Sequence, residues 1–84
     1  MPSPRPTERV LARRREIGDQ IRAARLHANL TQEAVALRAG MTLAQYNRIE
    51  QGHSSPLLDT LIRIADAIGV PLADLVREEP RPAP

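Results

Sequence analysis

The sequence contains no cysteine and no lysine, and Tyr46 is its only aromatic residue. The absence of cysteine excludes a disulfide framework, a thiolate metal site and a thiol nucleophile. Because 42% of the 84 residues are hydrophobic but only one is aromatic, the core must be aliphatic, and an all-helical bundle suits that inventory. A chain of this length has room for one compact domain.

Long apolar runs are also absent. The N-terminal residues contain no stretch that could serve as a signal peptide, and charged residues interrupt every later apolar segment well short of a membrane span. We therefore expect a soluble, cytoplasmic protein without a membrane partner.

The sequence offers little to build catalysis from. His27 and His53 are the only imidazoles, and neither has metal-ligand spacing with a carboxylate pair. Ser54 and Ser55 beside His53 do not form a triad, and a Ser-Ser-Pro segment before a helix is more simply a cap. We expect no enzymatic activity, no cofactor, no metal and no small-molecule ligand.

Charge is unevenly distributed along the chain. Residues 1–16 carry five arginines and two glutamates, whereas residues 53–84 carry three arginines and five acidic residues. This asymmetry is compatible with a nucleic-acid partner contacted by the N-terminal half, although proteins that bind no nucleic acid also have such surfaces. Arg13, Arg14 and Arg15 form either a basic arm along DNA or a solvated helix face.

Alternating prolines at both ends prevent regular helix there. We therefore predict a flexible basic arm over residues 1–16, a folded domain over 17–76 and a flexible Pro-rich tail over 77–84. A helix over residues 7–16, capped by Thr7, is the alternative for the second half of the arm.

Apolar spacing predicts five helices and no strand. In the first, over residues 17–28, Ile17, Ile21, Ala24 and Ala28 recur at three- and four-residue steps, and Leu26 is expected to add to the same core. The next three predicted helices cover residues 32–39, 42–51 and 57–68, and a fifth starts at residue 71.

Turn residues separate these helices. Thr31 and Thr42 are good N-caps, and Gly40, Gly52 and Gly69 each end a helix. The second helix, the short turn containing Gly40 and the third helix have the spacing of a helix-turn-helix, in which small side chains allow a close crossing.

Residues 17–76 closely resemble the Cro and phage-repressor (XRE) family of helix-turn-helix regulators. The strongest elements of the resemblance are Leu30-Thr31-Gln32-Glu33, Ala36, Ala39-Gly40-Met41-Thr42, Tyr46, Ile49-Glu50, Gly52, Pro56, Thr60-Leu61 and Val70-Pro71-Leu72. The resemblance implies a lambda-repressor-like five-helix bundle that binds double-stranded DNA, with helix 42–51 in the major groove and helix 32–39 across the phosphate backbone. Such a protein would be cytoplasmic, and nucleoid-associated when bound to DNA.

The residues of the third helix divide into two faces. Tyr46 and Ile49 point inward, so the opposite face becomes the candidate for reading bases. It carries Leu43, Ala44, Asn47 and Arg48. Leu43 and Ala44 depart from the polar residues common in the family, which puts a hydrogen-bonded code at those positions in doubt but leaves contacts with thymine methyl groups open.

Contacts to phosphates need donors at or near helix N-termini. The candidates are Gln32, Thr42, Gln45, Ser54 and Ser55. The resemblance further implies a partly buried structural ion pair between Arg25 and Glu50.

The fifth helix has more apolar surface than the end of a chain needs. We therefore expect Leu72, Leu75 and Val76 to contribute to a homodimer that binds a two-fold related operator. The alternative function is a helical protein-protein adaptor, or an antitoxin-type module, that does not read sequence.

Overall fold

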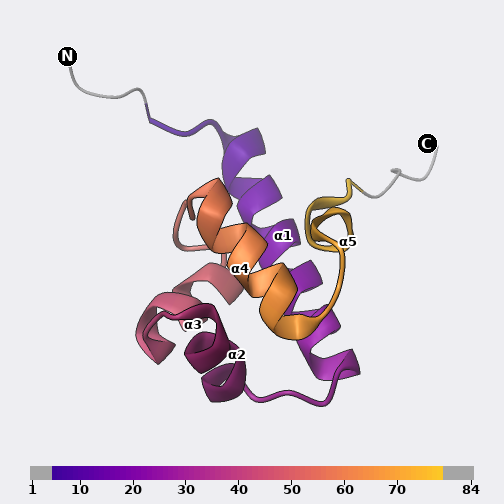
Figure 1. Cartoon of the computed structure of the whole chain (residues 1–84). Helices are drawn as coiled ribbons and strands as arrows, with labels where there is room; N and C mark the ends of the chain where they lie inside the picture. Colours follow the sequence, from indigo (N-terminus) through magenta and orange to yellow (C-terminus); the bar gives the residue numbers. More distant parts are fainter. Residues whose placement is uncertain (1–4, 79–84) are drawn as a thin grey trace.

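The computed structural model describes residues 5–78 and is entirely helical in that range apart from connecting turns (Figure 1). The helices are α1 (Glu8–His27), α2 (Gln32–Ala39), α3 (Leu43–Glu50), α4 (Leu58–Ile68) and α5 (Leu72–Val76). The all-α, five-helix fold class is thereby confirmed. None of the described helices has the length and hydropathy needed to cross a membrane.

Helix α1 starts earlier than predicted. The Thr7 hydroxyl accepts a hydrogen bond from the amide of Val10 at 3.1 Å, and the helix then runs without a break to His27. A domain boundary at residue 17 is therefore wrong, and the helical alternative over residues 7–16 describes the chain. The remainder of the predicted arm and most of the predicted tail, residues 1–4 and 79–84, lie outside the described residues.

Contacts with the end of α5 explain why the first half of α1 packs in the bundle. Arg13 donates a hydrogen bond through Nη2 to the carbonyl of Val76 at 2.9 Å, and Gln20 donates to the carbonyl of Arg77 at 2.6 Å. Because the last carbonyls of a helix have no partner within it, these side chains satisfy groups that would otherwise need water.

Each helix contributes one fully buried side chain to the core. These five residues, all 0% exposed, are Ile21, Val35, Tyr46, Ile64 and Leu75. Leu75 is thus enclosed by its own chain, and the prediction that it contacts a second copy is wrong. Leu72 and Val76 are half-buried against the same core.

Two other residues expected in the core are exposed. Leu26 is 53% exposed because it lies five positions after Ile21, about 140° around the helix from the buried stripe. Ala28 is exposed because α1 ends at His27 and Ala28 is the C-cap residue.

The α2–α3 turn has the expected helix-turn-helix form. Gly40 ends α2 in the left-handed conformation, with φ of 73°, which glycine adopts without steric cost. Ala36 and Ala39 are each 3% exposed, so small side chains lie where these helices pack. Thr42 and Gln45 form a reciprocal capping box at the start of α3.

The loop before α4 does not cap it as predicted. The N-cap position is Leu57, which makes no side-chain capping bond, so Ser54 and Ser55 lie too early in the chain to cap the helix.

Helices α1 and α3 meet backbone to backbone at Gly18. A Cβ atom added there would lie 2.8 Å from the carbonyl oxygen of Ile49 and would also collide with that of Glu50. The absence of a side chain at Gly18 therefore lets the end of α3 rest on α1.

A buried ion pair fixes the same contact. Arg25 of α1 donates from Nε to Glu50 Oε2 at 2.7 Å and from Nη2 to Glu50 Oε1 at 3.1 Å. The two residues are 8% and 6% exposed. Arg25 Nη1 also donates to the carbonyl of Leu30 at 3.0 Å, so the guanidinium holds three segments together. The predicted pair is present.

Replacing Gly18 with alanine is expected to destabilise the protein, although alanine is favoured over glycine inside a helix by about 1 kcal/mol. The added methyl group would push against α3 backbone that cannot move alone. Thermal unfolding followed by circular dichroism measures the effect. Ala23→Gly, at an exposed position of α1, measures the difference in helix propensity between alanine and glycine without a change in packing. A Gly18→Ala protein that melts above the wild type would contradict the close backbone contact.

Replacing Glu50 with alanine is expected to cost about 3–5 kcal/mol, because it leaves the Arg25 guanidinium buried without its partner. Urea denaturation measures the loss, with Glu33→Ala, an exposed acidic residue on α2, as the control for charge. The double variant Arg25→Met/Glu50→Leu should be more stable than Glu50→Ala, since no unpaired charge remains. A nearly unchanged unfolding midpoint in Glu50→Ala would show that the pair is not structural.

Candidate nucleic-acid interface

One face of α3 is open to solvent. Leu43 is 42% exposed, Ala44 and Arg48 are exposed, and Asn47 is partly exposed. The buried residues of α3 are Tyr46, Ile49 and Glu50. The structure therefore brings together the four residues predicted to read bases, with apolar side chains in the first turn and polar ones in the second.

Asn47 is held by a chain of hydrogen bonds. Its Nδ2 donates to Gln32 Oε1 at 3.2 Å, and Gln32 Nε2 donates to Glu50 Oε1 at 3.1 Å. Gln32, predicted as a phosphate contact, is thus joined to the Arg25–Glu50 pair. The sequence identifies Gln32 and Asn47 as candidate site residues, but it does not predict the hydrogen bond between them.

The charges of this cluster are stabilised by its hydrogen bonds. Burial alone would raise the pKa of Glu50, but the hydrogen bonds from Arg25 and Gln32 and the nearby Tyr46 hydroxyl lower it more, so the pKa lies below its usual value. The hydrogen bond to Glu50 raises the pKa of Arg25 against the effect of burial. Burial, followed by the interaction with Glu50, raises the pKa of Tyr46, whose hydroxyl has no hydrogen-bond partner among residues 5–78. The cluster therefore keeps its charges at neutral pH.

A cleft of about 400 Å³ lies between α1 and α3 beside Asn47 and Gln32. Arg15 and Arg22 of α1 line it, together with Gln51 at the end of α3. Sequence analysis did not single out Arg22. Its seven-residue separation from Arg15, two helical turns on one face, is the signal that could have found it.

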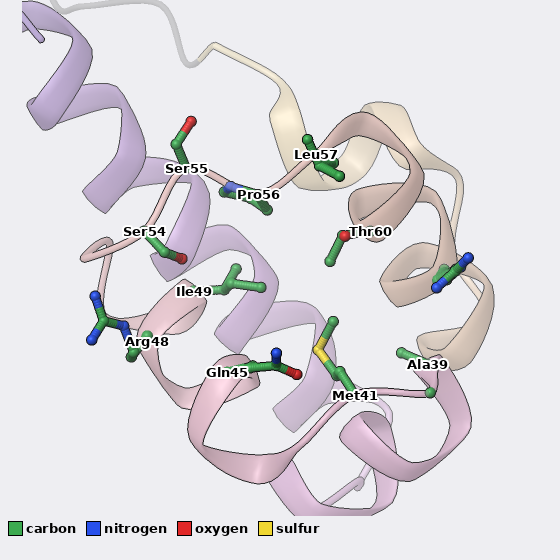
Figure 2. A pocket seen from close by; sticks show the side chains of 12 residues that line it. Ala39, Met41, Gln45, Arg48, Ile49, Ser54, Ser55, Pro56, Leu57 and Thr60 are labelled. Atoms are coloured by element: carbon green, nitrogen blue, oxygen red, sulfur yellow. The ribbon is translucent and has the colours of Figure 1, made fainter. Parts of the chain in front are cut away.

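A second cleft, of about 430 Å³, lies on the other side of α3, where the α3–α4 loop meets α4 (Figure 2). Arg48 and Arg63 line it, and Ile49 and Met41 contribute apolar surface. Figure 2 shows Ser54 turned towards the cleft and Ser55 turned away from it. The Ser54 hydroxyl is buried and has no hydrogen-bond partner within residues 5–78, whereas Ser55 is exposed.

The two remaining candidates for phosphate contact are occupied in the capping box. Thr42 Oγ1 accepts from the amide of Gln45 at 3.1 Å, and Gln45 Oε1 accepts from the amide of Thr42 at 3.0 Å. The Nε2 group of Gln45 and the backbone N–H groups of Leu43 and Ala44 remain as donors among the described residues.

The run of three arginines does not act as one unit. Arg13 is bound to Glu16 and to the end of α5. The Nε of Arg14 is buried and has no hydrogen-bond partner in the described part of the chain, while Arg15 reaches the α1–α3 cleft. Within residues 5–78, no three histidine, aspartate or glutamate side chains are grouped to hold a metal ion.

Known proteins resemble this chain in sequence. A cryptic phage CTXphi transcriptional repressor, RstR, of Vibrio cholerae is 39% identical over 59 residues, which are 70% of this chain and 53% of that protein. The chain thus spans about half the length of that relative. The uncharacterised HTH-type transcriptional regulator y4dJ of Sinorhizobium fredii is 33% identical over 63 residues, 75% of this chain and 82% of that protein.

Solved structures share the fold. The restriction-modification controller protein C.AhdI from Aeromonas hydrophila superimposes with a TM-score of 0.74 at 23% identity, over 76% of this chain and 97% of that one. The family model for HTH_3, helix-turn-helix, matches residues 21–75, from the middle of α1 to α5. The chain therefore belongs to the HTH_3 helix-turn-helix family, which confirms the family predicted from its sequence.

Proposed function

We propose that this DNA-binding transcriptional regulator reads a specific double-stranded sequence by placing α3 in the major groove, and that it acts as a repressor or autoregulator. The observation that carries the proposal is the exposed face of α3, with Asn47 and Arg48 adjacent in its second turn and an arginine-lined cleft on each side.

The side chains of this face suit direct readout. A guanidinium such as that of Arg48 pairs with the O6 and N7 atoms of guanine, and an amide such as that of Asn47 pairs with adenine. The Arg48 side chain is exposed and makes no hydrogen bond or ion pair within the described residues, so its guanidinium donors are available; its backbone carbonyl accepts from the amide of His53. Leu43 and Ala44 suit contact with the methyl groups of thymine.

The flanking clefts suit the phosphate backbones that border the groove. On the α1 side, Arg15 and Arg22 line the cleft next to Gln32, with the carboxylate of Asp19 between them. On the α4 side, Arg63 offers guanidinium donors at the cleft, and Ser55 offers an exposed hydroxyl on the adjoining loop. Such contacts position the protein on DNA without reading sequence, and they make the affinity depend on salt.

Arg48→Ala is expected to relax the preference at one base pair of each half-site by about 1–3 kcal/mol, because a bidentate contact to guanine is lost. Fluorescence anisotropy at two salt concentrations measures this on duplexes that the wild type enriches from a random library. Arg77→Ala removes the same charge from a residue paired with Asp74 on α5, and serves as the control.

Two results would contradict this proposal. If the wild type binds enriched and random duplexes with equal affinity, α3 does not read a specific sequence. Affinity that hardly changes with salt would favour the protein adaptor, because each phosphate contact contributes about 0.9 to the slope of log affinity against log salt, whereas an apolar interface contributes little. The exposure of Leu43 is the observation that supports an adaptor.

We also propose that the protein binds its operator as a homodimer with half-sites about one helical turn apart. Since Leu75 lies in the core, the interface is left to Leu72 and Val76 and to exposed side chains of α4, which packs on α5. Leu58 and Ile62, four residues apart on α4, are 62% and 41% exposed.

Sedimentation equilibrium is expected to give a dimer at tens of micromolar protein, and Ile62→Glu is expected to convert it to monomer, since a charge in an apolar interface is left unpaired. Leu37→Glu, which changes an 82% exposed leucine of α2, should leave the dimer intact. A monomeric wild type at this concentration would exclude the homodimer.

A further inference from the structure

The contact between Gln32 and Asn47 joins α2 to the candidate reading face of α3. We propose that Gln32 is a positioning residue, which holds the Asn47 amide in one orientation for base reading, and that the Arg25–Glu50 pair fixes Gln32 in turn. This inference rests on the proposed reading of DNA by α3 and assigns Gln32 a part in specificity beyond a contact to phosphate.

The charge of Glu50 determines the orientation of both amides. An ionised carboxylate only accepts hydrogen bonds, so the group of Gln32 that faces Glu50 Oε1 at 3.1 Å must be its NH₂. The carbonyl oxygen of Gln32 then faces Asn47 and accepts at 3.2 Å from Nδ2. Reversing either amide would bring two acceptors or two donors together. The lowered pKa of Glu50 means that this constraint holds at neutral pH.

The fixed orientation leaves a defined set of groups free on Asn47. One N–H is used by Gln32, and the second N–H and Oδ1 are not engaged by the described residues. A donor and an acceptor on one amide complement N7 and N6 of adenine, and this pairing discriminates roughly 5- to 150-fold against a wrong base.

Holding Asn47 in place before DNA arrives also reduces the entropy lost on binding. Immobilising one flexible side chain at an interface costs roughly 2- to 12-fold in affinity, and a side chain that is already held avoids most of that cost. A carboxylate buried with its guanidinium is a rigid anchor, because Arg25 contacts Glu50 through two nitrogens.

The test measures base preference rather than affinity alone. Duplexes enriched by the wild type from a random library are substituted one base pair at a time, and the affinity of each is measured for Asn47→Ala, Gln32→Ala and the double variant. Glu33→Ala, the exposed neighbour of Gln32 on α2, is the matched control.

We expect Asn47→Ala to abolish discrimination at one base pair of each half-site. Gln32→Ala should reduce discrimination by about 2- to 12-fold at that same base pair and leave the other positions unchanged. The double variant should discriminate no worse there than Asn47→Ala, because Gln32 acts through Asn47.

A role in phosphate binding or in folding would give different results. If Gln32 only contacts phosphate, Gln32→Ala weakens binding to all sequences equally and lowers the salt slope by about 1. If it only supports Glu50, the melting temperature falls and base preferences stay the same. Either result without a position-specific loss overturns the proposal.

Failure of the proposed function gives a separate result. A wild type that enriches no sequence contradicts DNA reading by α3, and the positioning role is then decided in the free protein. ¹⁵N relaxation of the Asn47 side-chain amide should show greater mobility in Gln32→Ala than in the wild type or Glu33→Ala. Equal mobility in all three proteins overturns the positioning role.

Discussion

The buried pair of Arg25 and Glu50 is the interaction on which the rest of this small structure depends. Removing two charges from water is costly, and attraction between them repays that cost only when the geometry is good and the remaining polar atoms are satisfied. Here two hydrogen bonds join the partners, Leu30 takes a third guanidinium nitrogen, and Gln32 donates to the carboxylate. Together with the backbone contact at Gly18, the pair fixes the position of α3 on α1.

This constraint explains how an eight-residue helix presents a defined face for the proposed reading of DNA. A helix so short is not stable alone, and its orientation comes from packing. Tyr46 and Ile49 pack into the core on one side, so Arg48 must point outward. Glu50 is the last residue of α3, and Gln32 joins its carboxylate to Asn47 one turn earlier, so hydrogen bonds connect the buried ion pair to a side chain at the surface.

The parts of the structure that could be predicted from sequence are those set by local patterns. The caps at Thr31 and Thr42, the left-handed Gly40 and the inward face of α3 follow from short-range rules. The parts that could not be predicted depend on contacts distant in sequence. Arg13 meets the Val76 carbonyl across 63 positions, and no periodicity reveals that bond. Leu75 has the pattern of an exposed apolar face, yet it is fully buried where α5 packs against α1 and α4.

The three consecutive arginines show why a charge run is a poor guide to a surface. In a flexible arm they could all reach one groove, but successive residues of a helix point about 100° apart. Once Thr7 starts α1, Arg13 must face α5, Arg14 is partly buried, and Arg15 is left at the cleft beside Asn47. The basic surface of this protein is therefore made by side chains from different helices, at Arg15, Arg22, Arg48 and Arg63. Its charge lies on both sides of α3, where the backbones bordering a groove would lie.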